Sequence, residues 1–179
     1  MRYMEWAILT YRVPQDPSRH RVAIWRELRR AGAVSLQQAT WALPVHPATD
    51  ATIDRVLTLV ARADGEALVF DARPRGDAVA ASIEAAFLEG REDEWREFIR
   101  ECDKFDEEIR HEIAKRKFTA AELDEEEQNL ERLQRWYREL RGRDVLGAPS
   151  AQDAELRLKS SSERLEAFAQ QVFDLGGGA

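Results

Sequence analysis

The spacing of apolar residues changes once along this chain, near residue 76, and that change restricts the folds the chain can adopt. Before it, short apolar runs rich in β-forming residues alternate with segments whose apolar residues recur every three or four positions. After it, the three-to-four spacing continues to the Gly-rich C-terminus. The sequence therefore predicts an α+β unit over residues 1–75, followed by an all-helical unit over residues 76–179.

The first unit is predicted to follow the order β-α-β-β-α-β. Its strands are expected at Glu5–Val13, Ala33–Gln37, Thr40–Val45 and Glu66–Ala72, and its helices at residues 18–31, with Ser18 as the N-cap, and at Thr49–Ala63. This order is the split βαβ pattern of ferredoxin-like folds. In such folds two helices cover one face of a four-stranded antiparallel sheet.

The second unit is predicted to contain a long helical hairpin and a third helix. The hairpin would pair two helices of roughly 25 residues, each near 38 Å long. An apolar stripe runs along the first from Trp95 to Ile113, and Thr119 with Glu122 has capping-box spacing at the start of the second. The last helix has heptad spacing from Ala154 and would either close the hairpin or pack on the first unit.

Charge is divided unevenly between the two units, although the net charge is only −7. Residues 1–75 hold 11 arginines, no lysine and 8 acidic residues, whereas residues 76–179 hold 16 basic and 26 acidic residues. No apolar run approaches the roughly 20 residues of a membrane span, and the N-terminus lacks a signal-peptide pattern. A single cysteine, Cys102, excludes an internal disulfide. These features predict a cytoplasmic protein that does not associate with membranes.

The first predicted helix concentrates the arginines. On a helical wheel, Val22, Trp25 and Leu28 define its expected buried face. The arginines are Arg19, Arg26 and Arg30, together on one flank of that face, and Arg21 and Arg29, near its edges. Planar guanidinium groups bind phosphate and other oxyanions through paired hydrogen bonds, so this helix is a candidate anion-binding surface. The alternative is a solvated surface that forms salt bridges with the acidic half of the chain.

Other polar and aromatic residues give weaker candidates. Cys102 falls in the apolar stripe and is expected in the core, as are Trp25 and Trp41; base stacking by Trp41 would require it on the open face of the sheet. His111 follows Glu108 with the E-x-x-H spacing of di-iron helices, but no second copy occurs, so we expect a surface histidine. No nucleotide-binding or hydrolase motif occurs, and neither a metal nor a cofactor is predicted.

The arginine-rich segment also carries a resemblance to a known family. Residues Arg21 to Ala33 follow the run R-V-x-x-W-R-x-L-x-x-x-G-A, after a strand and Pro17-Ser18. This run, together with Leu43-Pro44 and the D-x-x-G-x-P stretch that begins at Asp144, resembles the N-terminal domain of the chromate-resistance regulator ChrB. The similarity spans about residues 5 to 170. A more distant likeness is to Cas2-like domains, including the one in PaaX-type repressors.

The resemblance implies a DNA-binding, chromate-responsive regulator of a chromate-efflux operon. The basic residues that match the family's run are Arg21, Arg26, Arg29 and Arg30. Arg12 and Arg19 join the candidate site from the charge argument alone. The expected partner is DNA or a small oxyanion such as chromate, and a homodimer would double the basic surface. Full-length members of the family carry a second, C-terminal domain, so the expectation here concerns the DNA-binding or scaffold role.

Two other functions are consistent with parts of the sequence. The acidic helical arm could act as a protein-interaction or dimerisation module through its heptad seam, or it could mask the arginines. A Cas2-like nuclease would need a carboxylate at the end of the first strand to hold Mg²⁺. Tyr11 is instead followed by Arg12, which would repel a cation, and Asp16 stands alone. We therefore expect no enzymatic activity.

Overall fold

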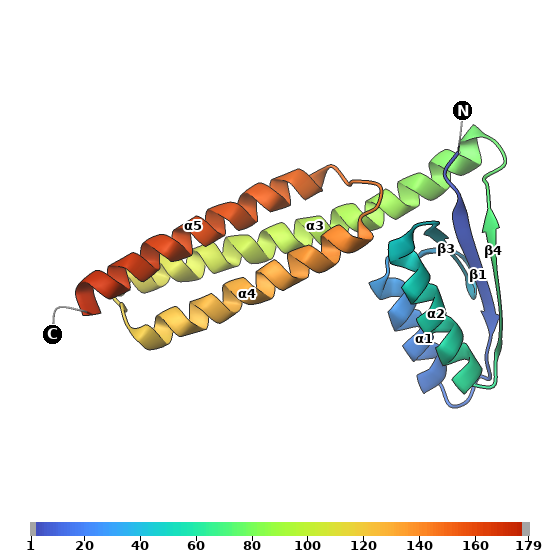
Figure 1. Cartoon of the computed structure of the whole chain (residues 1–179), viewed down its shortest axis with the longest axis horizontal. Coiled ribbons are helices and arrows are strands. Elements are labelled where there is room, and N and C mark those ends of the chain that lie inside the picture. Colours follow the sequence, from blue (N-terminus) through green and yellow to red (C-terminus); the bar gives the residue numbers. More distant parts are fainter. Residues whose placement is uncertain (1–2, 177–179) are drawn as a thin grey trace. The chain divides into compact units, whose positions relative to one another are not determined.

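The computed structural model of the chain describes residues 3–176, which form a four-stranded sheet and five helices (Figure 1). It divides into two compact units, Met1–Arg91 and Glu92–Ala179. The elements are β1 (Trp6–Arg12), α1 (Arg19–Arg30), β2 (Val34–Gln37), β3 (Thr40–Pro44), α2 (Pro47–Arg62), β4 (Glu66–Ala72), α3 (Asp77–Ala114), α4 (Ala120–Arg143) and α5 (Ser150–Gly176). None of the helices among these residues is both long and apolar enough to cross a membrane.

The sheet of the first unit has the ferredoxin-like order β2-β3-β1-β4, with every neighbouring pair antiparallel. Leu9 at the centre of β1 pairs with Trp41 of β3 on one side and Val69 of β4 on the other. Helices α1 and α2 lie together on one face of the sheet (Figure 1). The core between these layers contains Leu9, Ile24, Leu28, Ala33, Trp41, Leu43, Val56 and Val60. The predicted βαββαβ fold is confirmed, and Trp41 lies in the core as expected.

The opposite face of the sheet carries the alternate residues of each strand. Trp6 lies on this face because side chains alternate along β1 and Leu9 points to the helices. The start of α3 covers Trp6, whose ring meets that of Phe87 edge-on at 6.0 Å between centroids. On β4, an edge strand, Leu68 and Phe70 remain exposed. The first compact unit therefore extends into α3, whereas the predicted domain boundary at residue 76 marks only the start of that helix.

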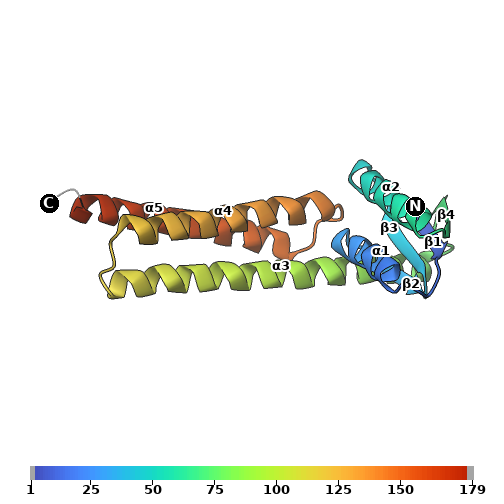
Figure 2. The same cartoon turned by 90° about the horizontal axis from the view of Figure 1, so that it is seen from below.

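The second unit is built from the rest of α3 with α4 and α5, which run alongside one another (Figures 1 and 2). The predicted stripe on α3 is buried at Trp95, Phe98, Cys102, Phe105 and Ile109. The seam of α5 is buried from Ala154 to Val172, so α5 closes the hairpin. The expectation of two helices of similar length is wrong for α3, which has 38 residues. An Ala-rich segment without a proline lets this helix begin directly after Gly76.

A buried aspartate organises the turn between α4 and α5. Asp144, at the end of α4, accepts hydrogen bonds from Trp95 Nε1 at 2.9 Å and from the backbone N–H of Gly147 and Ala148, at 3.1 and 2.9 Å. Gly147 has φ +74°, a conformation that favours glycine. From α3, Glu92 accepts the backbone N–H of Ser150 at 2.8 Å. The D-x-x-G-x-P stretch is thus a compact turn tied to α3 by its aspartate.

The first residues of the helices agree less well with the prediction than the positions of the helices along the chain do. Ser18 lies before α1 but has helical dihedral angles and makes no side-chain cap, so the predicted cap is wrong there. Helix α2 begins at Pro47 rather than at Thr49, because His46 Nδ1 accepts the N–H of Ala48 at 3.1 Å. The predicted cap of α4 is confirmed: Thr119 Oγ1 accepts the N–H of Glu122 at 3.3 Å. A histidine ring nitrogen thus provides a cap that the usual N-cap residue preferences do not anticipate.

Candidate nucleic-acid interface

Helix α1 turns a different face to the core from the one predicted. Ile24 and Leu28 are fully buried, whereas Val22 is 40% exposed and Trp25 is 49% exposed. The assignment of Val22 and Trp25 to the core is therefore wrong. Ile24 and Leu28, four positions apart on α1, fill the core below this helix together with Trp41. Trp25 lies outside that core. Because this other face is buried, the exposed arginines of α1 surround an exposed aromatic ring.

The solvent side of α1 is a cationic surface with an indole in its middle. Residues four apart on a helix lie on one row, and Arg21, Trp25 and Arg29 form such a row. The guanidinium carbon of Arg29 lies 5.8 Å from the centroid of the Trp25 ring, a cation–π distance. All the arginines of this helix are exposed. We call the following set the arginine face: Arg19, Arg21, Trp25, Arg26, Arg29 and Arg30.

The single acidic residue of α1 is directed away from the arginine face. Glu27 has a side chain only 14% exposed, and its carboxylate accepts a hydrogen bond from Arg55 Nε of α2. Arg30 also approaches this carboxylate, at 3.9 Å. Within residues 3–176, Arg19, Arg21 and Arg26 make no ion pair or side-chain hydrogen bond. Their positive charge is therefore not compensated by carboxylates of the described chain.

Arg12, the remaining predicted site residue, is placed differently. It ends β1 and forms an ion pair with Glu66 of β4 at 2.8 Å, with both side chains well exposed. Its neighbour Tyr11 packs against the core under the helices, so Arg12 points to the opposite face of the sheet. The structure therefore brings together the five arginines of α1 and does not bring Arg12 to them.

Tyr11 lies beneath the arginine face and is half-buried. Burial raises the pKa of its phenol, while the nearby indole N–H of Trp41 and the positive charge of Arg21 act in the opposite direction. The phenol therefore stays protonated at neutral pH. The sequence does not identify Tyr11 as a neighbour of the arginines. The alternation of side chains along a strand predicts which face of the sheet Tyr11 lies on, but not which helix residue packs near it.

The other candidates from the sequence occupy structural positions. Cys102 is fully buried, as predicted, and burial together with Asp106 and Asp103 raises the pKa of its thiol to about 12. That thiol is protonated at neutral pH, and the thiolate is the reactive form. His111 is exposed, as predicted, on the last turns of α3.

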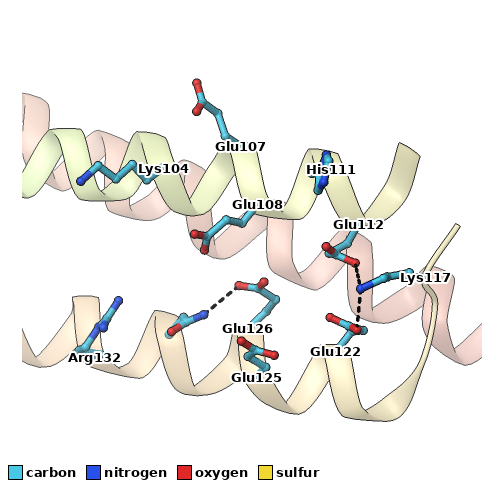
Figure 3. Close-up of a pocket in the computed structure, with 11 residues that line it drawn as sticks. Lys104, Glu107, Glu108, His111, Glu112, Lys117, Glu122, Glu125, Glu126 and Arg132 are labelled. Atoms are coloured by element: carbon cyan, nitrogen blue, oxygen red, sulfur yellow. Dashed lines mark hydrogen bonds and ion pairs between the residues drawn. The ribbon is translucent and has the colours of Figure 1, made fainter. Parts of the chain in front are cut away.

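An acidic cleft of about 790 Å³ lies between α3 and α4. Figure 3 shows Glu108 and Glu126 entering it from opposite helices. Glu126 is 5% exposed, and burial, with neighbouring glutamates, raises the pKa of its carboxyl. Lys117 forms ion pairs with Glu112 and Glu122 at one end. No group of three or more His, Cys, Asp or Glu side chains in the described part of the chain is arranged to hold a metal ion.

The comparison with known families agrees with the resemblance noted in the sequence. The model of the family "Protein ChrB, N-terminal" matches residues 21–178, nearly the whole chain. The matched segment begins within α1 at Arg21, so it includes Trp25, Arg26, Arg29 and Arg30 but neither Arg12 nor Arg19. A search of the curated proteins finds no match.

Proposed function

Because the chain belongs to the family of ChrB N-terminal domains, we propose that it is a DNA-binding transcriptional regulator in chromate resistance and that its arginine face binds the phosphate backbone. Family membership suggests a regulator related to chromate resistance. The observation that carries the DNA-binding part is the exposure of five arginines on one helix, three of them without a carboxylate partner in residues 3–176.

The position of the arginines along α1 supports a binding role over a purely structural one. Cations near a helix C-terminus interact favourably with the helix dipole, which gives Arg29 and Arg30 a structural reason to be there. Arg19 and Arg21 lie in the first turn, which has no acidic residue, and positive charge there is unfavourable. An anionic partner that supplies the missing negative charge would account for them.

The arginine face suits an extended polyanion better than an isolated chromate ion. A small oxyanion is held most strongly where donors converge in a site shielded from water, because the low local dielectric strengthens each contact. The arginines of α1 instead lie along an exposed helix surface. Successive phosphates of DNA can meet such a row one by one, and each contact releases counterions.

The test is the salt dependence of DNA affinity in the variant R19Q/R21Q/R26Q. Each lost phosphate contact lowers the slope of log affinity against log salt concentration by about 0.9, so the triple variant should lower it by about 2–3. The matched control is R12Q/R73Q/R75Q, which removes the same charge; Arg12 and Arg73 are ion-paired with Glu66 and Glu5. An unchanged slope in the first variant, or equal changes in both, would contradict the proposal.

We further propose that the protein has no nuclease activity. At the end of β1, where a metal-binding carboxylate would be needed, Arg12 is held by Glu66. Labelled DNA incubated with the protein and Mg²⁺ or Mn²⁺ is therefore expected to stay intact.

The arm-mediated dimer is also less favoured than the regulator, because the heptad seam of α5 is buried within its own unit.

A further inference from the structure

We propose that Trp25 stacks on a nucleobase, and that the arginine face therefore binds DNA containing an unpaired or unstacked base. This inference rests on the proposed function, because it concerns the same surface. It assigns a ligand-contacting role to a residue that phosphate binding alone does not need. It also separates DNA from a small oxyanion, which has no aromatic ring to stack.

The first argument is that Trp25 has no packing role that accounts for its exposure. It is 49% exposed and lies outside the core cluster beneath α1, whereas Trp6, Trp41 and Trp95 are buried at 1–6% exposure. Leaving half of a large indole in water forgoes much of the stabilisation that its burial would contribute. An indole that stacks on a base recovers that contact only in the complex.

The second argument is the chemistry on either side of the ring. Arg21 and Arg29 lie four residues before and four residues after Trp25, about 12 Å apart along the helix axis at 1.5 Å per residue. A base on the ring would thus have a guanidinium group on each side, where the neighbouring phosphates of its own strand can reach. Proteins that bind single strands combine these two elements, a cationic track and aromatic stacking.

The third argument is that the immediate surroundings of the indole are cationic. The guanidinium carbon of Arg29 lies 5.8 Å from the ring centroid, a cation–π distance, so a group that can bind phosphate already lies beside the ring. The carboxylate of Glu27 pairs with Arg55 of α2 and with Arg30, and it does not pair with Arg21 or Arg29 on either side of the ring. Chromate, by contrast, would gain nothing from the apolar face of an indole.

The experiment measures binding of the full chain to a fluorescent oligo(dT) of about 15 nucleotides, near the upper end of typical single-strand site sizes. A duplex of the same length is measured in parallel. Loss of one base stack costs about 1–3 kcal/mol, so W25A should weaken oligo(dT) binding by about 5- to 150-fold. W25F should retain most of the affinity, and W25A should keep the wild-type salt slope because no phosphate contact is lost.

The matched control is L68A, which removes from β4 an apolar side chain that is also exposed, at 67%, and should leave the affinity unchanged. A second readout does not depend on the alanine variant folding. Oligo(dT) should quench the tryptophan fluorescence of the wild type more strongly than that of W25F, because the other tryptophans are buried or half-buried.

The outcomes separate this inference from the proposed function. Duplex binding without oligo(dT) binding, or equal oligo(dT) affinity of wild type and W25A, would overturn the stacking role and leave the regulator proposal standing. Absence of binding to both DNAs would overturn both. Release of the oligonucleotide by chromate, but not by sulfate at equal ionic strength, would assign the face to the oxyanion and overturn the stacking role.

Discussion

Gly65 connects α2 to β4 at a place where the backbone leaves no room for a side chain. A Cβ atom there would lie 2.5 Å from the carbonyl oxygen of Arg12 and 2.6 Å from Val13 Cγ1. A side chain at this position would clash unless the backbone at the end of β1 moved, because a backbone carbonyl cannot rotate away as a flexible side chain can.

We expect G65A to lower the free energy of unfolding by about 1–3 kcal/mol, the usual cost of overpacking. Gly142 supplies the control, since nothing lies within 4 Å of a Cβ built there and it sits inside α4. G142A should stabilise the protein by about 0.5–1 kcal/mol, because alanine favours the helix. Urea denaturation measures both; a neutral G65A would show that β1 yields without cost.

Glu126 is a buried acid whose environment disfavours its charge. Burial raises the pKa of its carboxyl, and Glu108, Glu125 and Glu112 add to this effect, while a hydrogen bond from Asn129 opposes it. The folded state therefore holds the proton more tightly than the unfolded state. The group's contribution to stability is fully present below its unfolded pKa and is lost as pH rises through the folded pKa.

Two substitutions test this sign. E126Q keeps the side-chain shape and removes the charge, so it should raise the melting temperature at pH 7.5 and have a smaller effect near pH 5. E125Q, at an exposed position on the same helix, should change little at either pH. Lys104, Lys117 and Arg132 also line the cleft, so a higher stability of wild type than of E126Q at pH 7.5 would mean that these cations hold Glu126 ionised.

The single residues of the candidate site were harder to predict than the core. Cys102 and Trp41 followed from periodicity, because each falls on an apolar stripe or strand that one partner surface buries. Trp25 did not, because helix periodicity offered two overlapping apolar stripes, one with Val22 and one with Ile24. Only the tertiary packing of Ile24 and Leu28 decides between them. The exposure of the Trp25 indole could therefore not be predicted from the sequence pattern.

At the level of elements, the turn after α4 is the most specific feature of the second unit. Asp144 is 6% exposed and accepts hydrogen bonds from donors on α3 and on the turn itself. D144A should destabilise the protein by roughly 2–4 kcal/mol, because buried donors such as the Trp95 indole lose their acceptor at about 1–3 kcal/mol each. D93A, at an exposed position on α3, is the control and should cost well under half as much. Equal effects in urea denaturation would refute the role of the turn.

Strand and helix positions were largely predictable, since β4 lies at its predicted bounds and β1 differs by one residue at each end. Periodicity of two or of three to four residues identifies an element whenever one face is buried. Helix starts were less predictable because they depend on local hydrogen bonds, such as the one His46 accepts and the one Ser18 does not make. The length of α3 was missed because its first turns are Ala-rich and show little amphipathic contrast.

For the molecule as a whole, the charge asymmetry persists when it is counted over the compact units. Residues 1–91 carry 12 basic and 11 acidic residues, so the excess of negative charge lies in residues 92–179. That the acidic arm masks the arginine face stays a prediction. A fragment that tests it should end after Arg91 rather than at residue 75, because Phe87 of α3 packs on Trp6.

Helix α3 has a thermodynamic consequence for how the protein melts. It runs from Asp77 to Ala114 without a break, across the division at residue 91. Helical order propagates cheaply along a chain but is costly to start or interrupt, since each new end leaves backbone groups unbonded. Losing either unit would create such an end inside α3. The two units should accordingly unfold as one cooperative system, although each has its own core.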